Sequence, residues 1–324
     1  MRVVAFAPEH LAGAVTLFRA RLRRLRRLVP SLPARLTQAS DARELLAGFL
    51  RADRCLVALE DGRMVGYLGW REYESFRGVP SRAAYSPEFG HAAARGREVE
   101  AYRALYRAAS GRWFDAGCRI HCLTDLAGDA SLARFWFASG FGELGQDALR
   151  PLPGPPVLDS PTRPVTGRDL RVRAAGAADI PALARLDAEH VRHYADPPVL
   201  MVPQHPETEA DLSAFLAQPP NAYWLVEAAG EPQGFLRFEA ESHGAARISL
   251  APDTISITGA FVRPAWRARG AATAMLAGAV AHHAAQGFQR MAVDYETINP
   301  EALAFWPRHF AVVASSYVRV PERA

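Results

Sequence analysis

The fold of this chain is decided by residues 258–276, which read Thr258-Gly-Ala-Phe-Val-Arg-Pro-Ala-Trp-Arg-Ala-Arg-Gly-Ala-Ala-Thr-Ala-Met-Leu276. A β-rich run ends near Val262, an arginine-rich turn follows, and apolar residues at helical spacing then begin a helix. Small residues let backbone N–H groups at a helix start approach a ligand closely, and the helix dipole favours an anion there. Arginines in the turn add bidentate donors for phosphate.

This stretch predicts a pyrophosphate cradle at the junction of a strand and a helix. Its residues are Arg267, Ala268, Arg269, Gly270, Ala271 and Ala272. A glycine turn with solvated arginines is the structural alternative for the same pattern. The context favours the cradle, because Asn299-Pro-Glu-Ala-Leu-Ala-Phe-Trp306 begins a second helix directly after another strand.

In the rest of residues 169–324, the sequence pattern predicts strands and helices, which alternate in the last part of this segment. The expected elements are strands at 169–173, 254–263, 290–296 and 311–319, a hairpin at 222–239, and helices at 178–194, 208–217, 269–286 and 299–309. This order predicts a mixed sheet flanked by helices, of the α/β or α+β class.

The two halves of the chain repeat each other. Gly-x3-Gly followed by an aromatic residue and leucine occurs at Gly62 and again at Gly230, in each case inside an expected hairpin. The stretch from Gly117 to Trp136 matches Gly287 to Trp306 with a constant offset of 170 residues. We interpret this repetition as an ancient duplication.

A proline-rich segment separates the repeats. Residues 151–168 contain six prolines, which remove backbone donors and favour an extended linker. We therefore expect a first domain at 1–150, a linker at 151–168 and a second domain at 169–324.

The two motifs of the second half resemble those of the GNAT superfamily of acetyl-CoA-dependent N-acetyltransferases. Members carry [Gln/Arg]-x-x-Gly-x-[Gly/Ala] after the fourth strand and Asn-x-x-Ala-x-x-Phe after the fifth. Here Arg267, Gly270 and Ala272 match the first motif, and Asn299, Ala302 and Phe305 match the second. The resemblance covers residues 169–324 and, more weakly, the first 150, so it implies two tandem GNAT folds, each a mixed and mostly antiparallel sheet flanked by helices.

The resemblance also implies how acetyl-CoA is held. Backbone groups of Phe261 and Val262 should bind the pantetheine arm, residues 267–272 the pyrophosphate, and Asn299 should hydrogen-bond near the thioester. Phe305 belongs to the same cofactor site through the second motif.

One position departs from the family pattern. Many members have tyrosine after the phenylalanine of the second motif, where it can protonate the leaving thiolate, and this chain has Trp306. An indole N–H is a donor but not an acid at physiological pH. We expect Tyr317, on the last strand, to take this role, with water as the other source of the proton.

Glu296 is the expected general base. Alternation in the strand 290–296 places Asp294 and Glu296 on one face, and Glu296 lies at the carboxyl end, where the family brings in its acceptor. A carboxylate there with a raised pKa could accept the amine proton. In the alternative, these carboxylates cap a helix or bind a cationic acceptor without proton transfer, and Asp187 and Glu189 add to the negative charge.

The first half lacks the features of a cofactor site. At the 170-residue offset, the cradle corresponds to Arg97-Glu-Val-Glu-Ala-Tyr102, and Asn299 to Asp129. Carboxylates at a helix start repel pyrophosphate, and a bulky Tyr102 falls where a small residue is needed. We therefore expect a degenerate domain that kept the scaffold and lost the cofactor.

Composition excludes several other classes. Three cysteines do not form a disulfide framework, no metal site has its usual ligand spacing, and no run is long and apolar enough for a membrane span. No signal peptide is evident, so we expect a cytoplasmic protein. All the basic residues counted as Lys or Arg are arginine, which suggests a GC-rich bacterial genome. A net charge of +4 permits an anionic ligand but does not indicate nucleic acid. The sequence leaves the oligomeric state open.

The function expected from these observations is transfer of an acetyl group from acetyl-CoA to a primary amine, by direct attack on the thioester. The acceptor is expected to be a small molecule and cannot be identified from the sequence. The alternative is a non-catalytic acyl-CoA-binding or regulatory module, which the tryptophan at 306 keeps open.

Overall fold

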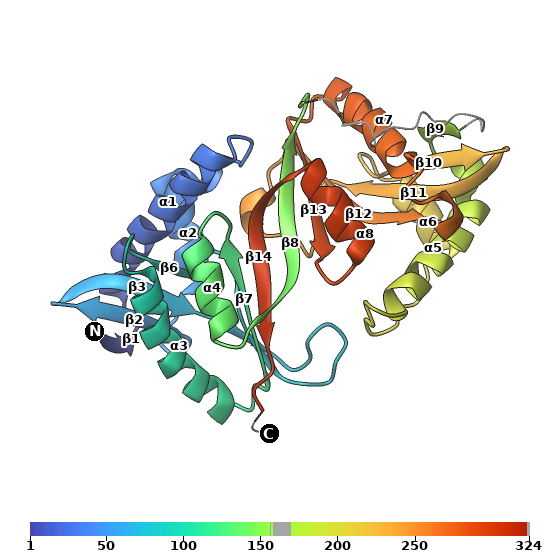
Figure 1. The fold of residues 1–324 in the computed structure, drawn as a ribbon. Coiled ribbons are helices and arrows are strands. Elements are labelled where there is room, and N and C mark those ends of the chain that lie inside the picture. The colour runs from blue at the N-terminus through green and yellow to red at the C-terminus, as the bar shows by residue number, and fades with distance from the viewer. Residues whose placement is uncertain (156, 158–169, 323–324) are drawn as a thin grey trace. The chain divides into compact units, whose positions relative to one another are not determined.

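The computed structural model describes residues 1–155, 157 and 170–322 (Figure 1). This part of the chain forms two compact units. Unit 1 consists of Met1–Asp147, Ala246–Ser249 and Val312–Ala324, and unit 2 consists of Ala148–Ala245 and Leu250–Ala311.

Unit 2 is built on strands from the second half of the sequence. These strands are β9 (Leu170–Ala174), β10 (Ala222–Ala228), β11 (Glu231–Glu239), β12 (Thr254–Val262) and β13 (Arg290–Glu296). Its α-helices are α5 (Ile180–Ala195), α6 (Glu209–Leu216), α7 (Ala271–Ala285) and α8 (Pro300–Phe305). Short 3-10 turns are η3 (Ala177–Asp179), η5 (Pro264–Trp266) and η6 (Trp306–Arg308). These elements confirm the order expected from hydrophobic spacing for residues 170–308.

The sheet of unit 2 has the strand order β13-β12-β11-β10-β9. All its neighbouring strands are antiparallel except β12 and β13, which run parallel. That parallel pairing covers only the register from Thr254 with Arg290 to Ile257 with Val293. Beyond Ile257 the two strands separate, while β12 stays paired with β11 up to Val262. The sheet therefore opens along the last five residues of β12.

Helices cover both faces of this sheet. Helix α7 packs on β9, β10 and β11, whereas α5 packs on β11 and β12, and Figure 1 shows α7 and α5 on opposite sides of the strands. The core between α5, α6 and the sheet includes Leu183, Leu212, Leu225 and Phe235, all almost fully buried. Burial of such side chains contributes about 1.5–3 kcal/mol each, which fixes the helices on the strands that carry the site.

Unit 1 repeats this design. Its strands are β1 (Arg2–Ala5), β2 (Cys55–Glu60), β3 (Arg63–Gly69), β4 (Arg71–Tyr73), β5 (Ala83–Ser86), β6 (His91–Ala93), β7 (Ile120–Leu126) and β14 (Ala311–Arg319), which enters it at Val312. Its helices are α1 (Leu11–Leu28), α2 (Ala39–Phe49), α3 (Glu98–Asp115) and α4 (Ala130–Ala138), with 3-10 turns η1 (Pro8–His10), η2 (Arg35–Thr37) and η4 (Arg247–Ser249). Strand β8 (Gly142–Pro151) begins in unit 1.

The two hairpins share details that sequence similarity alone does not require. Each hairpin turns through a non-glycine residue and a glycine that both have positive φ, Asp61-Gly62 in unit 1 and Ala229-Gly230 in unit 2. Such pairs form the turns that match the twist of a two-residue hairpin. The pairing register also shifts at the same place, between Ala58 and Leu59 and between Val226 and Glu227. This local agreement supports the duplication.

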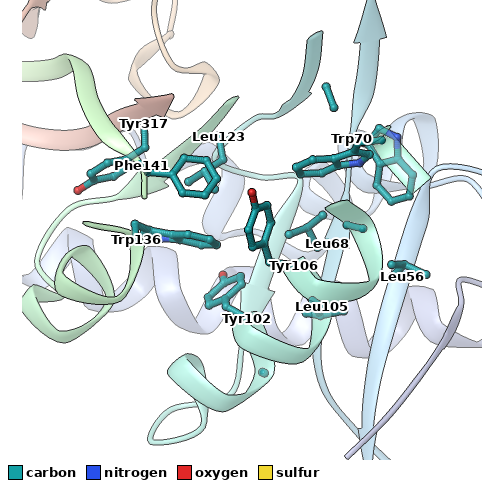
Figure 2. Packing of buried hydrophobic residues seen from close by; sticks show 14 of the residues in the cluster. Leu56, Leu68, Trp70, Tyr102, Leu105, Tyr106, Leu123, Trp136, Phe141 and Tyr317 are labelled. Atoms are coloured by element: carbon teal, nitrogen blue, oxygen red, sulfur yellow. The ribbon is translucent and has the colours of Figure 1, made fainter. Parts of the chain in front are cut away.

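The strand that contributes Tyr317 belongs to the core of unit 1. Strand β14 pairs antiparallel with β7, from Ala314 opposite Leu126 to Arg319 opposite His121. Tyr317 is buried in a cluster with Trp136, Tyr106 and Phe141, and Figure 2 shows these rings together.

The division of the chain therefore differs from the expected one. Residues 246–249 and 312–324, expected in the second domain, lie in unit 1, and unit 2 begins at Ala148. Residues 312–319 lie in unit 1 because β14 pairs with β7. Residues 246–249 lie there because two buried carboxylates accept their backbone N–H groups: Glu88 accepts the N–H of Ile248, and Asp147 accepts the N–H of Ala246. Most of the expected linker, residues 156 and 158–168, lies outside the described residues.

Among the described helices, none is both long and apolar enough to cross a membrane.

A buried polar network occupies the middle of unit 1. Arg21 donates to Asp125 at 2.5 Å and to the Tyr102 hydroxyl at 3.0 Å. Tyr102 also contacts Nδ1 of His91 at 2.8 Å, and the indole of Trp136 donates to Asp125. All five side chains are almost fully buried, so each polar atom depends on the others for its hydrogen bonds.

This burial predicts acid sensitivity of the fold. Burial lowers the pKa of His91 to about 4, whereas histidine in an unfolded chain titrates near about 6.5. The unfolded state binds the proton more readily between these values, so the free energy of unfolding falls as the pH drops from about 6.5 to 4. The shift corresponds to about 3 kcal/mol. Thermal melts by circular dichroism from pH 7 to pH 4 should show this loss, and His91→Gln should reduce its slope because an amide cannot take up the proton. An unchanged slope would contradict the assignment.

Candidate functional site

A cavity of about 370 Å³ lies in unit 2 at the opening between β12 and β13. Ala260, Phe261 and Val262 of β12 line one side, and Asn299, Ala302, Phe305 and Trp306 of the α8 region line another. The start of α7 closes one end with Gly270, Ala271, Ala272 and Thr273. The cofactor-binding residues predicted from the sequence in β12, the cradle and the α8 region therefore all line one cavity, with the exception of Arg269.

The loop before α7 presents unpaired backbone donors. Ala268 and Gly270 both have positive φ, at 55° and 82°, and Gly270 is the N-cap of the helix. Among the described residues, the N–H groups of 268–273 donate no hydrogen bond to a backbone oxygen. A concave run of amides at the positive end of a helix is an anion-binding arrangement. Alanines at 271 and 272 keep side chains out of its way.

The arginines of the cradle differ in their availability. Arg267 turns back towards the strand, where Nε donates to the Val262 carbonyl at 2.9 Å and Nη1 pairs with Glu301 at 2.5 Å. Arg269 is exposed and lies over the ring of Trp266 at 5.8 Å. Arg308, which sequence reasoning missed, is exposed and lines the cavity. Neither Arg269 nor Arg308 has an ion pair among the described residues, so these two side chains can face an anion.

Asn299 has a structural task in addition to the expected one. Its side-chain oxygen accepts the N–H groups of Glu301 and Ala302, at 3.2 and 3.3 Å, and so caps α8. The side chain is buried and lines the cavity. Because the oxygen is used by the cap, only the amide N–H₂ group remains to donate to a ligand.

A second cavity of about 270 Å³ lies next to the first, between β12 and β13. It shares three lining residues with the first cavity: Tyr194, Ala260 and Trp306. Its walls also include Ile257, Thr258, Val293, Asp294, Tyr295 and Glu296 from β12 and β13, His190 and Val191 from α5, and Met201, Val202 and Gln204 from the following loop. The volume is below the roughly 300–1,000 Å³ of pockets for drug-sized ligands.

The carboxylates of β13 lie at this second cavity. Asp294 and Glu296 both line it, and so do Val293 and Tyr295, which the alternation of the strand places on the opposite face. Asp294 accepts the hydroxyl of Ser242 at 2.8 Å. Negative side chains on an otherwise largely apolar wall favour a cationic group there.

The other acidic residues of the sequence analysis have partners away from this cavity. Glu189 forms a bidentate ion pair with Arg263, with the shortest distance at 2.7 Å. Asp187 accepts the N–H of Glu207 at 2.8 Å and lies 3.9 Å from Nδ1 of His190. These carboxylates position α5, its loop and the imidazole of His190 rather than line the cavity themselves.

Tyr317 does not lie among the described residues that line either cavity. Its ring packs against Phe137 at 5.7 Å within unit 1, and burial raises its pKa to about 12. A phenol with a raised pKa is a poorer proton donor. Its contacts therefore assign Tyr317 to the core of unit 1, in place of the expected role in protonating a thiolate.

The equivalent place in unit 1 also holds a cavity, of about 780 Å³, and its charged lining residues are Arg21, Arg24, Arg27, Arg95, Glu98, Glu100 and Asp129. At the 170-residue offset, Ala272 corresponds to the buried Tyr102, and Phe261 corresponds to His91. The imidazole of His91 forms a hydrogen bond with the Thr124 carbonyl at 2.9 Å, which links β6 to β7, two strands that do not pair with each other. Asp129 caps α4 as Asn299 caps α8. The scaffold is thus repeated, while the residues that line the cavity differ from those of unit 2.

Comparisons with known proteins agree with this geometry. Residues 189–311 match the model of the acetyltransferase (GNAT) family. No curated protein matches the chain in sequence.

Three solved structures resemble the fold. A GCN5-related N-acetyltransferase from Sphaerobacter thermophilus has 15% identity and a TM-score of 0.56, over 98% of this chain and 95% of that one. A glucosamine N-acetyltransferase region of a fungal multi-domain GH3 β-N-acetylglucosaminidase has 13% identity and a TM-score of 0.52, over 98% of this chain and 38% of that one. A tandem GNAT protein from the clavulanic acid biosynthesis pathway has 16% identity and a TM-score of 0.43, over 97% of each chain.

The first of these structures shares its fold with almost the whole of this chain, in agreement with two tandem repeats of one fold. The family match falls on the repeat that holds both cavities and supports N-acyl transfer in general. Residues 189–311, most of which lie in unit 2, therefore carry the match to the GNAT acetyltransferase family.

Proposed function

We propose that unit 2 transfers an acetyl group from acetyl-CoA to the primary amine of a small molecule. The observation that carries this proposal is the pair of cavities that meet at Tyr194, Ala260 and Trp306. One cavity ends at the unpaired amides of the α7 loop, which suit a pyrophosphate, and the other carries two carboxylates, which suit an ammonium.

The donor would lie along the open edge of β12. The loop amides of 268–273, with Arg269 and Arg308, would hold the pyrophosphate. The pantetheine arm would follow Phe261 and Val262, because β12 has no strand partner on its β13 side there. Backbone N–H groups near Val262 would then polarise the thioester carbonyl, which stabilises the oxyanion of the transition state.

The acceptor would reach the thioester from the second cavity. Its nitrogen forms a bond to the acetyl carbon, the carbon–sulfur bond breaks, and the amine proton passes to Glu296 as general base. The lining of both cavities contains no cysteine, and all three cysteines are buried in unit 1. This supports direct attack on the thioester rather than transfer through a cysteine acyl-enzyme.

One measurement, the release of CoA from acetyl-CoA, distinguishes the proposed transferase from a non-catalytic acyl-CoA-binding module. Incubation with acetyl-CoA and a panel of small primary amines should release CoA, detected as free thiol, together with a mass gain of one acetyl group on the amine. Binding of acetyl-CoA without CoA release across the panel would favour the regulatory alternative.

We expect one acetyl-CoA site per chain. Both units have a cavity at this place, but Glu98, Glu100 and Asp129 line that of unit 1, and carboxylates repel a pyrophosphate. Isothermal titration calorimetry with acetyl-CoA should give a stoichiometry near one. Two equivalent sites would contradict the view that unit 1 has lost its cofactor.

Gly270→Glu should abolish acetyl-CoA binding. A carboxylate at the N-cap of α7 would occupy the anion position and repel the pyrophosphate. The matched control is Gly287→Glu, because Gly287 also has positive φ, at 91°, lies in the same unit and does not line the cavity. Both variants carry the strain of a side chain at positive φ, roughly 1–2 kcal/mol. Calorimetry should show binding by the control alone, and equal affinities would place the cofactor elsewhere.

Glu296→Gln tests the base. The change keeps the shape of the side chain and removes its basicity, so kcat should fall by roughly 10²–10⁴ while acetyl-CoA affinity stays the same. Part of the rate should return at high pH, where more of the amine is neutral. Glu241→Gln, an exposed change in the same unit, is the control. An increase confined to the acceptor KM would instead make Glu296 a binding residue.

A further inference from the structure

The cavity of unit 1 has no role in the proposed function. Its volume of about 780 Å³ lies within the roughly 300–1,000 Å³ that is typical of small-molecule sites. Three segments that are far apart in the sequence form its walls: the second half of α1, the start of α3 with the loop before it, and the loop between β7 and α4. All three belong to unit 1, so this unit holds a candidate binding site of its own.

The second half of α1 makes one wall of this cavity basic. Arg21, Arg24 and Arg27 recur every three residues and share one face of the helix, and Arg95 adds a fourth guanidinium from the loop before α3. Arg21 is held by the buried network of unit 1, and Arg24 pairs with Glu98 at 3.3 Å. Arg27 and Arg95 are exposed and form no ion pair among the described residues. These two side chains can therefore bind an anionic group.

Three carboxylates line the same cavity, and each stands at a position that belongs to the expected cofactor site in unit 2. At the 170-residue offset, Glu98 and Glu100 replace small residues of the anion-binding loop, and Asp129 replaces Asn299. The changes that repel a pyrophosphate thus give this cavity the charge that attracts a cation.

Two of these carboxylates have an oxygen atom available for a ligand. Oδ1 of Asp129 accepts the N–H of Leu132 at 3.0 Å and caps α4, which leaves Oδ2. Glu100 is exposed in the first turn of α3 and forms no ion pair among the described residues. The cavity therefore offers available charge of both signs, on Arg27 and Arg95 and on Glu100 and Asp129.

Apolar side chains line the cavity as well. Leu25, Val99 and Leu126 contribute to its walls, and so does Leu28, which is 66% exposed. An apolar ligand chain would remove such surfaces from water. A polyanion would meet the three carboxylates and a polycation the four guanidinium groups, and like charges repel. A molecule with one charge of each sign, joined by an apolar chain, finds a favourable partner for each of its parts.

We propose that the cavity of unit 1 binds a small zwitterion. Its anionic group lies at Arg27 and Arg95, its ammonium group lies at Glu100 and Asp129, and an apolar chain between them packs on the leucines. Such a ligand would occupy unit 1 whether or not unit 2 transfers acetyl groups. The duplicated unit thereby has a ligand of different chemistry at the place where its carboxylates repel the cofactor.

The first test measures binding to the full chain by isothermal titration calorimetry at low ionic strength, where ion pairs are least screened. The probes are ω-amino acids from 4-aminobutyrate to 8-aminooctanoate, and each is compared with the simple carboxylate and the simple amine of the same chain length. The best ω-amino acid should bind roughly tenfold more tightly than either counterpart, because a hydrogen bond to a charged group is worth about that factor. If no ω-amino acid binds more tightly than its counterparts, the proposal is overturned.

The second test locates the site, because amines also suit the second cavity of unit 2. Arg27→Gln combined with Arg95→Gln should weaken ω-amino acid binding roughly tenfold and leave that of the simple amine unchanged. Glu100→Gln combined with Asp129→Asn should weaken it as much without weakening the simple carboxylate. The asparagine keeps the cap of α4, since Asn299 caps α8 in the same way. A general loss of structure would not produce this crossed pattern.

The matched controls are Arg43→Gln and Glu44→Gln, exposed changes on α2 of the same unit that do not line the cavity. Both should bind the probes as the wild type does. A preference for the zwitterion that survives in both double variants would place the site elsewhere and overturn the assignment. Pyrophosphate that binds more tightly than every ω-amino acid, and loses affinity in the arginine variant, would make the cavity an anion site instead. CoA release by unit 2 enters none of these measurements, so a failure of the proposed function remains distinguishable from a failure here.

Discussion

The separation of β12 from β13 is the constraint on which the site depends. Parallel pairing ends at Ile257 with Val293, and the remaining residues of β12 keep one strand partner instead of two. Backbone groups left without a partner must be satisfied by something else, because a buried and unpaired group costs about 1–3 kcal/mol. Unit 2 leaves that edge facing a cavity, where water or a ligand that itself carries amides, such as pantetheine, can provide the missing bonds.

Unit 1 meets the same constraint with its own residues. Strands β5 and β7 pair in parallel only to Ser86 with Leu123, and β6 then pairs with β3 alone. There, His91 spans the gap to the Thr124 carbonyl, and Tyr102 fills the space that an alanine leaves open in unit 2. A bonding side chain at the gap thus satisfies the strand edge from within the protein. The duplicated fold contains both solutions in one chain.

Much of unit 2 could be predicted because its signals are local. Hydrophobic spacing gives the helices and strands, and the glycine and alanines of the α7 loop act through the absence of side chains, which a sequence shows directly. The assignment of β14 failed for the opposite reason. Nothing local in residues 311–319 states which edge the strand will join, since β7, its partner, lies far away in the sequence. The boundary of the units and the place of Tyr317 both followed from that single long-range pairing.

The candidate site shows the same division between local and long-range information. The cradle and the carboxylates of β13 lie within continuous motifs, whereas Arg308 and Tyr194 reach the cavities from elements whose place depends on packing. A signal for α5 was present in the sequence: Asp187, His190 and Tyr194 recur at intervals of three and four residues, so they share one face of the helix. Spacing alone cannot say that this face covers the junction of two cavities. That knowledge comes from the packing of α5 on β11 and β12. This packing places the side chain of Tyr194 beside the opening of the sheet, where it lines both cavities.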